Sequence, residues 1–264
     1  MFTIFLKTIN ERRVSLVAYA VFAVLLLMMF MSLYPSIQEN SQQLNELFQS
    51  YPQGLKDAFG LEEINFDTVE KFLSIQYFGF MWPMLVIVIA ISVGASLAWE
   101  KEEGTISVLL SRPISRLKIF FAQYLAGVSI LAVFSLISVF AAVSIASVNG
   151  IDYIFKNFLS IGFLGFLFGV AVLSVATFFS SIFSEKSRVL VFSGGMMLTM
   201  YTLNVMAGLK EALESLKYFS FFHYYDPSVA LAKGELEFSA IMVFIFMALV
   251  FLTFGAYIFN KKDI

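Results

Sequence analysis

Long uncharged runs alternate with polar segments along the chain, and each run is long enough to cross a membrane as a helix. A hydrocarbon layer about 30 Å thick takes about 20 residues of helix. Six runs reach this length. They cover residues 14–34, 72–98, 119–148, 158–183, 189–208 and 238–259. The pattern therefore predicts an all-α polytopic membrane protein with six transmembrane helices in a single domain over residues 1–264.

Apolar residues outside the six runs predict two further helices that do not cross the membrane. The N-terminal set shares one helical face and comprises Phe2, Phe5, Leu6 and Ile9. Such a face is typical of an interfacial helix lying flat on a leaflet, and a frayed tail is the alternative. In segment 35–71, apolar residues recur at helical spacing, which predicts a short helix against the membrane or the protein. They are Leu44, Leu47, Phe48 and Tyr51.

The second run has signals for its start and for a bend. Asp67 followed by Glu70 resembles a capping box, so we expect the helix to begin near these residues. Pro83 lies inside the run and removes a backbone donor, which predicts a kink.

Small residues mark one face of the fourth run. Gly162, Gly165 and Gly169 allow another helix to approach closely. Because this spacing is common in glycine-rich membrane helices, we predict tight packing within this chain rather than a seam between two chains. Gln123, near the start of the third run, is a candidate for a hydrogen bond between helices.

The composition agrees with lipid as the solvent. Hydrophobic residues make up 59% of the chain and charged residues 14%, and 32 residues are phenylalanine. A single water-soluble core cannot hide this much apolar surface. The net charge of −2 gives no reason to expect a nucleic acid as partner, and the lack of cysteine excludes disulfides and thiolate metal sites. The first run lacks a small-residue cleavage site and is therefore expected to be retained as a helix.

The distribution of basic residues predicts the orientation. If the N-terminus is cytoplasmic, the cytoplasmic segments hold eleven of the 17 lysine and arginine residues. Basic residues collect on the cytoplasmic side of membrane proteins. The opposite segments carry thirteen of the 19 acidic residues. We therefore expect both termini in the cytoplasm and a multi-pass protein of the cytoplasmic membrane.

Several kinds of chemistry have no sequence signal. The chain has no G-x-x-x-x-G-K-[ST] motif, so we expect it to bind no nucleotide or other cofactor. The six runs contain no ionisable Asp, Glu, Lys, Arg or His, whereas carriers driven by ion gradients place such groups near the membrane midplane. The only histidine, His223, lies among aromatic residues, which favours an interfacial belt over a metal or catalytic site. The chain is thus expected not to be an enzyme.

The segment between the second and third runs, residues 99–118, has the sequence WEKEEGTISVLLSRPISRLK. Three carboxylates follow the second run, at Glu100, Glu102 and Glu103. Gly104 permits a sharp reversal of the chain, and Thr105 is suited to cap a short helix that begins after it.

That short helix carries an apolar stripe. Ile106, Leu109 and Leu110 fall on one side of it. Arg112 precedes Pro113 and is biased away from helix, so the short helix ends there. The pattern predicts an amphipathic helix that projects from the membrane toward another protein, and the alternative is a loop with a polar face lying on the leaflet.

Residues 77–118 contain a G-x-F-x-W-P-x-L opening, the small-residue run SVGAS and the core E-K-E-E-G-T-x-x-x-L-L-S-R-P-I-S-R. This stretch resembles the permeases of ABC-2 type transporters, particularly the NosY-like branch. The six runs, the predicted cytoplasmic termini and the segment FFHYYDPSVALAKG before the last run fit the same family. The resemblance covers nearly the whole chain.

In such permeases the loop after the second helix is a coupling helix, which docks into a groove of a separate ATPase subunit. The resemblance implies that docking residues and flanking charges here are Glu100, Glu102, Glu103, Gly104, Thr105, Ile106, Leu109, Leu110, Arg112, Pro113 and Arg116. It also implies a pair of ATPases that bind ATP and Mg²⁺, a second permease copy or homologue, a substrate path between the permeases, and export as the direction.

Two other classes of function stay open from the residues alone. One is a non-transporting membrane assembly, immunity or sensor protein that recruits a cytoplasmic partner through the same loop. The other is a gradient-driven secondary carrier. The runs contain no convergent polar residues that identify a substrate.

Overall fold

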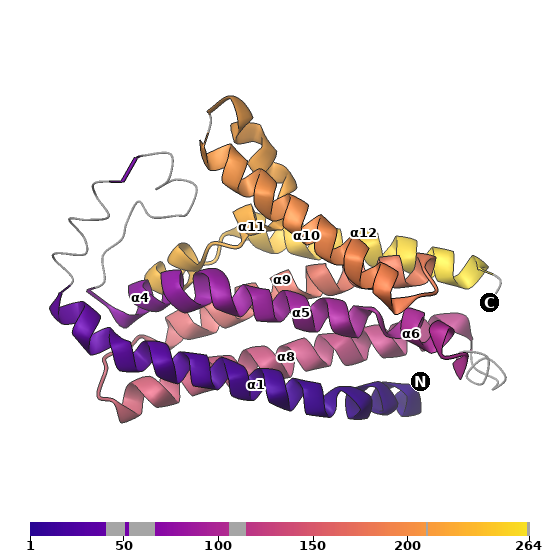
Figure 1. The fold of residues 1–264 in the computed structure, drawn as a ribbon, viewed down its shortest axis with the longest axis horizontal. Coiled ribbons are helices and arrows are strands. Elements are labelled where there is room, and N and C mark those ends of the chain that lie inside the picture. The colour runs from indigo at the N-terminus through magenta and orange to yellow at the C-terminus, as the bar shows by residue number, and fades with distance from the viewer. Residues whose placement is uncertain (41–50, 53–66, 106–114, 210, 263–264) are drawn as a thin grey trace.

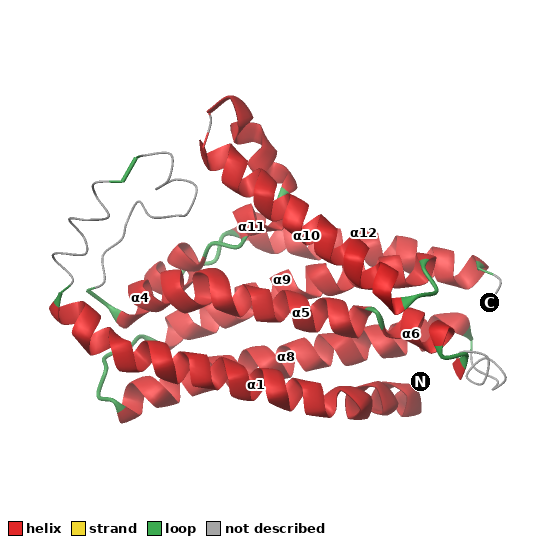
Figure 2. Cartoon of the chain, viewed as in Figure 1, coloured by secondary structure: helices red, strands yellow, loops and turns green. Residues whose placement is uncertain are grey.

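A computed structural model describes residues 1–40, 51–52, 67–105, 115–209 and 211–262. Within these ranges the regular elements are helices and none is a strand (Figure 2). Six helices are long and apolar enough to cross a membrane, which confirms the predicted number of spans. They are Phe2–Glu39, Val69–Gly94, Arg116–Val148, Phe155–Ile182, Lys186–Leu209 and Phe238–Lys261. The predicted short helix in segment 35–71 falls mostly outside the described residues.

The order of elements along the chain is simple. The α-helices are α1 (Phe2–Glu39), α4 (Val69–Gln76), α5 (Trp82–Gly94), α6 (Ser96–Glu102), α8 (Arg116–Val148), α9 (Phe155–Ile182), α10 (Lys186–Leu209), α11 (Phe221–Tyr224) and α12 (Phe238–Lys261). Three shorter elements are the π-helix η1 (Tyr77–Met81), the 3₁₀-helix η2 (Glu211–Phe219) and the π-helix η3 (Ser228–Lys233). The second span is built from α4, η1 and α5 in succession.

Helix α9 lies at the centre of the bundle. It packs against α5, α8 and α12, and it is the most buried of the six spans. Helix α1 packs mainly on α8, whereas α10 and η2 rise away from the bundle (Figure 1). The arrangement gives α1, α10 and α12 large apolar faces on the outside, as the hydrocarbon of a membrane requires.

The three glycines of α9 explain its central position. A Cβ at Gly165 would lie 1.8 Å from the ring of Trp82, and one at Gly162 would lie 2.4 Å from Val139. Trp82, whose ring packs against Gly165, is fully buried. The predicted packing of the glycine face within the chain is therefore confirmed. The predicted inter-helix hydrogen bond of Gln123 is not found, because both of its amide atoms are buried without a partner among the described residues.

The second span begins near the predicted residues, at Val69, but its cap differs from the prediction. The N-cap of α4 is Thr68, whose hydroxyl accepts from the backbone N–H of Lys71 at 3.4 Å. The carboxylate of Glu70 accepts from the backbone N–H of Ile154 at 2.7 Å, so it joins this helix to the segment before α9. The predicted capping box of Asp67 and Glu70 is therefore wrong, because Glu70 is used in a contact between distant segments.

Pro83 is accommodated by the wide π-helical turn of η1 immediately before it. In such a turn each N–H reaches the carbonyl five residues back, as the N–H of Trp82 does with Tyr77. Pro83 has no N–H, which leaves the carbonyl of Phe78 without its helical donor. The hydroxyl of Tyr225 donates to this carbonyl at 2.9 Å. The predicted irregularity near Pro83 thus takes the form of a π turn stabilised by a residue from the far end of the chain.

The N-terminal residues do not form a separate interfacial helix. Helix α1 runs without interruption from Phe2 to Glu39. The residues buried near its start are Ile4 and Thr8, and Ile4 packs into a cluster with α6, α8 and α12. The predicted apolar face is not the covered one, since Phe2 is 71% and Leu6 46% exposed, and its position at the membrane surface stays a prediction.

Candidate functional site

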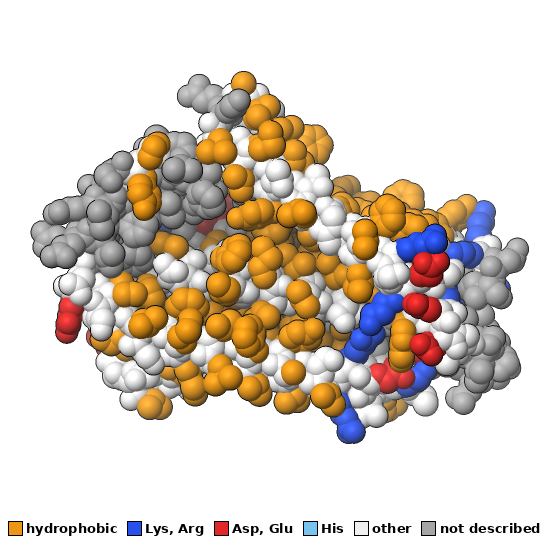
Figure 3. Space-filling model, viewed as in Figure 1, with side chains coloured by type: hydrophobic (Ala, Val, Ile, Leu, Met, Phe, Trp, Pro, Cys, Tyr) orange, Lys and Arg blue, Asp and Glu red, His pale blue; other side chains and the backbone are white. Residues whose placement is uncertain are grey.

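Charged side chains gather at one end of the bundle. Helix α1 begins and α12 ends at this end, which we call the termini end, and α6 lies there as well (Figure 1). On the face shown in Figure 3, lysine, arginine and acidic side chains cluster at the termini end, and hydrophobic side chains cover the middle of the molecule. The predicted loop 99–118 begins within this charged region.

Helix α6 is a separate element that follows a break at Ala95. The predicted second run, residues 72–98, therefore extends past the end of the second span at Gly94 into the start of α6. The break lies against α9, where a Cβ at Gly94 would be 2.5 Å from the Cβ of Ala176. The backbone N–H of Ala98 donates to the hydroxyl of Ser180 at 2.8 Å, so α6 is also bonded to α9.

Lys101 caps the C-terminal end of α9. Its ammonium donates to the backbone carbonyls of Ser180, Ser181 and Phe183 at 2.8, 3.3 and 3.3 Å. The last carbonyls of a helix lack intrahelical donors and carry partial negative charge, which a cation stabilises. Burial, followed by the nearby charge of Lys262, lowers the pKa of Lys101 to about 7. The amine is therefore held by the helix end in surroundings that disfavour its charge.

Glu102 makes the matching contact with the next helix. Its carboxylate accepts from the backbone N–H of Lys186, the first residue of α10, at 2.8 Å. The first N–H groups of a helix carry partial positive charge and lack acceptors, so a carboxylate is stabilising there. Two consecutive residues of α6 thus hold the end of α9 and the start of α10.

Glu100 ties α6 to α1. Its carboxylate accepts from the ammonium of Lys7 at 2.7 Å and from the hydroxyl of Thr105. The residue is 2% exposed, so this carboxylate points into the protein rather than toward a partner. Lys7 is also 3.6 Å from Glu11 on its own helix, which adds a second ion pair on α1.

The loop leaves α6 immediately after these contacts. Glu103 is exposed, and Gly104 has a φ of +70°, a conformation that favours glycine and turns the chain. The hydroxyl of Thr105 is directed back to Glu100, to its carboxylate and to its backbone carbonyl at 3.2 Å. Arg116, on the other side of the loop, donates to the backbone carbonyl of Lys262.

Five of the predicted docking residues fall outside the described residues. They are Ile106, Leu109, Leu110, Arg112 and Pro113. The predicted residues that the structure describes lie together at the termini end, where Glu100, Glu102 and Arg116 contact the chain itself.

Sequence reasoning missed the lysines that join the helices at the termini end. Lys7, Lys101 and Lys262 are among the eleven basic residues counted on the cytoplasmic side, and the sequence assigned no contact to any of them. Lys262 donates to the backbone carbonyl of Ile182 at 2.6 Å, so a second lysine caps α9. A lysine in the last turn of its own helix is a recognisable sequence signal, but these lysines cap a helix that is distant in the sequence.

The histidine of the chain, His223, lies between two tyrosine rings. His223 contacts the rings of Tyr218 and Tyr224 at centroid distances of 5.4 and 5.0 Å, and burial followed by the charge of Lys217 lowers its pKa. In the described part of the chain, no group of three His, Cys, Asp or Glu side chains is placed to hold a metal ion.

Comparison with known protein families identifies the family of the chain. The family described as ABC-2 family transporter protein matches the chain over residues 2–264. No curated protein matches the chain.

Proposed function

The chain belongs to the ABC-2 family of transporter proteins, and we propose that it is the permease subunit of an ATP-binding cassette transporter whose ATPase is a separate chain. In this proposal the ATPase binds ATP and Mg²⁺, and the permease moves a substrate out of the cytoplasm. A second permease copy or homologue completes the substrate path. The protein lies in the cytoplasmic membrane with both termini in the cytoplasm.

The attachment of α6 is the observation that supports this proposal most. If an ATPase displaces the loop, the loop must transmit that displacement to the membrane helices. Helix α6 directly precedes the loop and is bonded to α1 through Glu100, to α9 through Lys101 and to α10 through Glu102. Charge-assisted hydrogen bonds of this kind are roughly twice as strong as neutral ones. A displacement of the loop therefore shifts the ends of three membrane helices together.

Along the sequence E-K-E-E-G-T, the first three residues contact the bundle and the next residues begin the loop. Glu100, Lys101 and Glu102 hold α6 on the bundle, and Glu103 and Gly104 are exposed at its end. We assign the docking contact to residues 103–113, with Ile106, Leu109 and Leu110 as its apolar surface and Arg112 and Pro113 at its end. Thr105 and Arg116 then fix the two ends of the loop to the chain.

The distribution of charge supports the orientation. Helix α1 begins and α12 ends at the termini end, and the segments that the sequence assigns to the cytoplasmic side hold eleven of the 17 basic residues. Basic flanks favour the cytoplasmic side. A cytoplasmic ATPase would then meet the loop directly.

Copurification in mild detergent tests the proposal. We expect the chain, expressed with its neighbouring genes, to bring down a stoichiometric ATPase that has a P-loop. Leu109→Asp or Gly104→Pro is expected to lower both the recovered ATPase and its ATP turnover. Lys118→Gln is the matched control, because Lys118 is an exposed basic residue near the same loop.

Other outcomes would point to the competing functions. Recovery of the chain without any ATPase would contradict the proposal. Transport in proteoliposomes that follows an imposed ion gradient without ATP would identify a secondary carrier. A chain that moves no substrate with either energy source, but binds a cytoplasmic partner, would be an assembly, immunity or sensor protein.

A further inference from the structure

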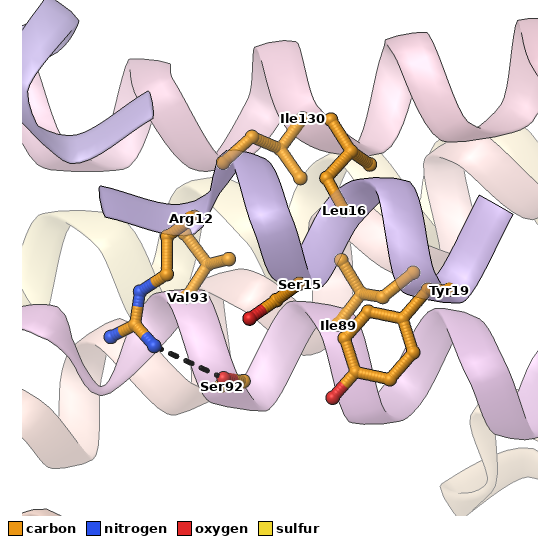
Figure 4. Close-up of a pocket in the computed structure, with 8 residues that line it drawn as sticks. All are labelled: Arg12, Ser15, Leu16, Tyr19, Ile89, Ser92, Val93 and Ile130. Atoms are coloured by element: carbon orange, nitrogen blue, oxygen red, sulfur yellow. Dashed lines mark hydrogen bonds between the residues drawn. The ribbon is translucent and has the colours of Figure 1, made fainter. Parts of the chain in front are cut away.

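A cleft between α1 and α5 opens near the termini end (Figure 4). It is lined by Arg12, Ser15, Leu16, Tyr19, Ile89, Ser92, Val93 and Ile130. The polar members come from α1 and α5, and Ile130 of α8 closes the cleft from the bundle side. Among these residues Arg12 also reaches α6, because its guanidinium lies over the ring of Trp99.

No described carboxylate forms an ion pair with the guanidinium of Arg12, and the charge that acts on it most directly is that of Glu11 on the same helix. The guanidinium donates to the hydroxyl of Ser92 at 3.5 Å and lies 5.7 Å from the centre of the Trp99 ring. The neighbouring carboxylates are occupied, since Glu11 lies 3.6 Å and Glu100 2.7 Å from the ammonium of Lys7. A guanidinium has five N–H donors, so most of them are left for a ligand.

Two more hydroxyl groups are available in the cleft. Ser15 and Tyr19 lie one and two turns further along α1, and their hydroxyls make no hydrogen bond with another described residue. In Figure 4 the guanidinium of Arg12 points toward Ser92, with the hydroxyl of Ser15 on the same side. These donors suit an anion with several acceptor oxygens, such as a phosphate group, which would lie at the mouth of the cleft because the cleft itself has a volume of about 10 Å³.

The rest of the cleft is apolar and runs along the span. Leu16, Ile89 and Val93 form its walls. The side chains of Val17 and Val88, on the same two helices, are 60% and 47% exposed, so both helices also present apolar surface outside the cleft. A ligand that fits both parts has an anionic head and a hydrocarbon tail.

We infer that this cleft binds the phosphate headgroup of an anionic lipid in the leaflet at the termini end. The guanidinium, flanked by Trp99, pairs with the phosphate, and the acyl chains lie along α1 and α5. Basic pockets between membrane helices recognise lipid headgroups in this way, and tryptophan is favoured at the same depth. The inference needs only that the bundle lies in a membrane, so it stands or falls separately from the proposed coupling to an ATPase.

Native mass spectrometry of the purified full-length chain tests this inference. Phosphatidylglycerol and phosphatidylcholine of equal chain length are titrated in separate samples. We expect the wild-type chain to bind phosphatidylglycerol at least about fivefold more tightly, and Arg12→Gln to remove that preference. Arg13→Gln is the matched control, because Arg13 is exposed on the same helix, and we expect it to change the preference less than about twofold.

Further variants separate the cleft from general charge and from misfolding. Arg12→Lys keeps the charge but loses the planar fork, and we expect an intermediate preference. Ser15→Ala combined with Tyr19→Phe keeps the charge and is expected to weaken phosphatidylglycerol binding about threefold or more. Equal binding of the two lipids, or an equal loss with Arg13→Gln, would overturn the inference. Binding of inorganic phosphate that competes with phosphatidylglycerol at millimolar concentration would assign the cleft to a free anion and overturn the lipid assignment.

Discussion

Replacement of Lys101 tests whether α6 is held to the bundle as described. The ammonium donates to three carbonyls at the end of α9, at 2.8, 3.3 and 3.3 Å. Hydrogen bonds to a charged group contribute about 1.5–3 kcal/mol each before the cost of burial. Burial already lowers the pKa of Lys101 to about 7, so part of this gain is offset. For Lys101→Gln we therefore expect a net loss of about 1–3 kcal/mol in the attachment of α6 to α9.

The assay compares ATP turnover with the amount of ATPase recovered. Since about 1.4 kcal/mol corresponds to a factor of ten, Lys101→Gln is expected to lower the turnover of the complex about fivefold or more. The amount of copurified ATPase should stay the same, because the docking loop is unchanged. Lys118→Gln, in an exposed position, should alter neither quantity. Turnover of Lys101→Gln equal to that of Lys118→Gln would refute a mechanical role for the contact.

Lys101→Gln should also change how the free energy of unfolding depends on pH. The pKa of Lys101 is lowered from 10.5 to about 7 in the folded chain, first by burial and then by Lys262. Between these two values the unfolded chain binds more protons than the folded one, so the contribution of Lys101 to stability rises with pH from about 7 to 10.5. Lys101→Gln is expected to remove that rise in thermal unfolding. An unchanged slope would contradict the assignment.

Three further substitutions test the packing and the polar contacts. Gly165→Ala places a methyl group against the buried ring of Trp82, so the free energy of unfolding should fall by about 2 kcal/mol or more in thermal unfolding. Gly194→Ala is the control, because Gly194 faces open space, and it should raise the free energy of unfolding by up to about 1 kcal/mol. Equal effects of the two substitutions would contradict the packing. Tyr225→Phe removes the hydroxyl that donates to the carbonyl of Phe78, so the free energy of unfolding should fall by about 1–2 kcal/mol. An unchanged free energy of unfolding would mean that this hydrogen bond is unimportant. Glu100→Gln weakens the pair with half-exposed Lys7, so the free energy of unfolding should fall by about 1–2 kcal/mol. Because the carboxylate of Glu100 is buried, high salt should not produce the same loss in the unsubstituted chain.

The six spans were predictable because lipid imposes a local rule. Every stretch that crosses the hydrocarbon must be apolar and helical, and that requirement is visible residue by residue. The close packing at Gly165 was predictable for a similar reason, since a small residue in a membrane helix admits a neighbour. The turn at Gly104 also agrees with its sequence, because a φ of +70° favours glycine.

The contacts between distant segments were not predictable from a single sequence. Nothing near Lys101 in the sequence indicates that it caps α9, and nothing near Tyr225 indicates that it completes the turn before Pro83. Glu70 has the spacing of a capping residue, but a backbone N–H from another segment competes successfully for its carboxylate. Patterns along the chain therefore predict a docking loop after α6, and only the fold shows how α6 is attached to the bundle.

Site-specific cross-linking tests the central claim most directly. The chain contains no cysteine, so Leu109→Cys introduces a single thiol into the proposed docking loop. With a short bifunctional reagent in native membranes, we expect Leu109→Cys to form an adduct with the ATPase. Asn149→Cys, exposed at the opposite end of the bundle, should form none. Adducts of Leu109→Cys with lipid or with its own chain alone, and none with an ATPase, would contradict the account.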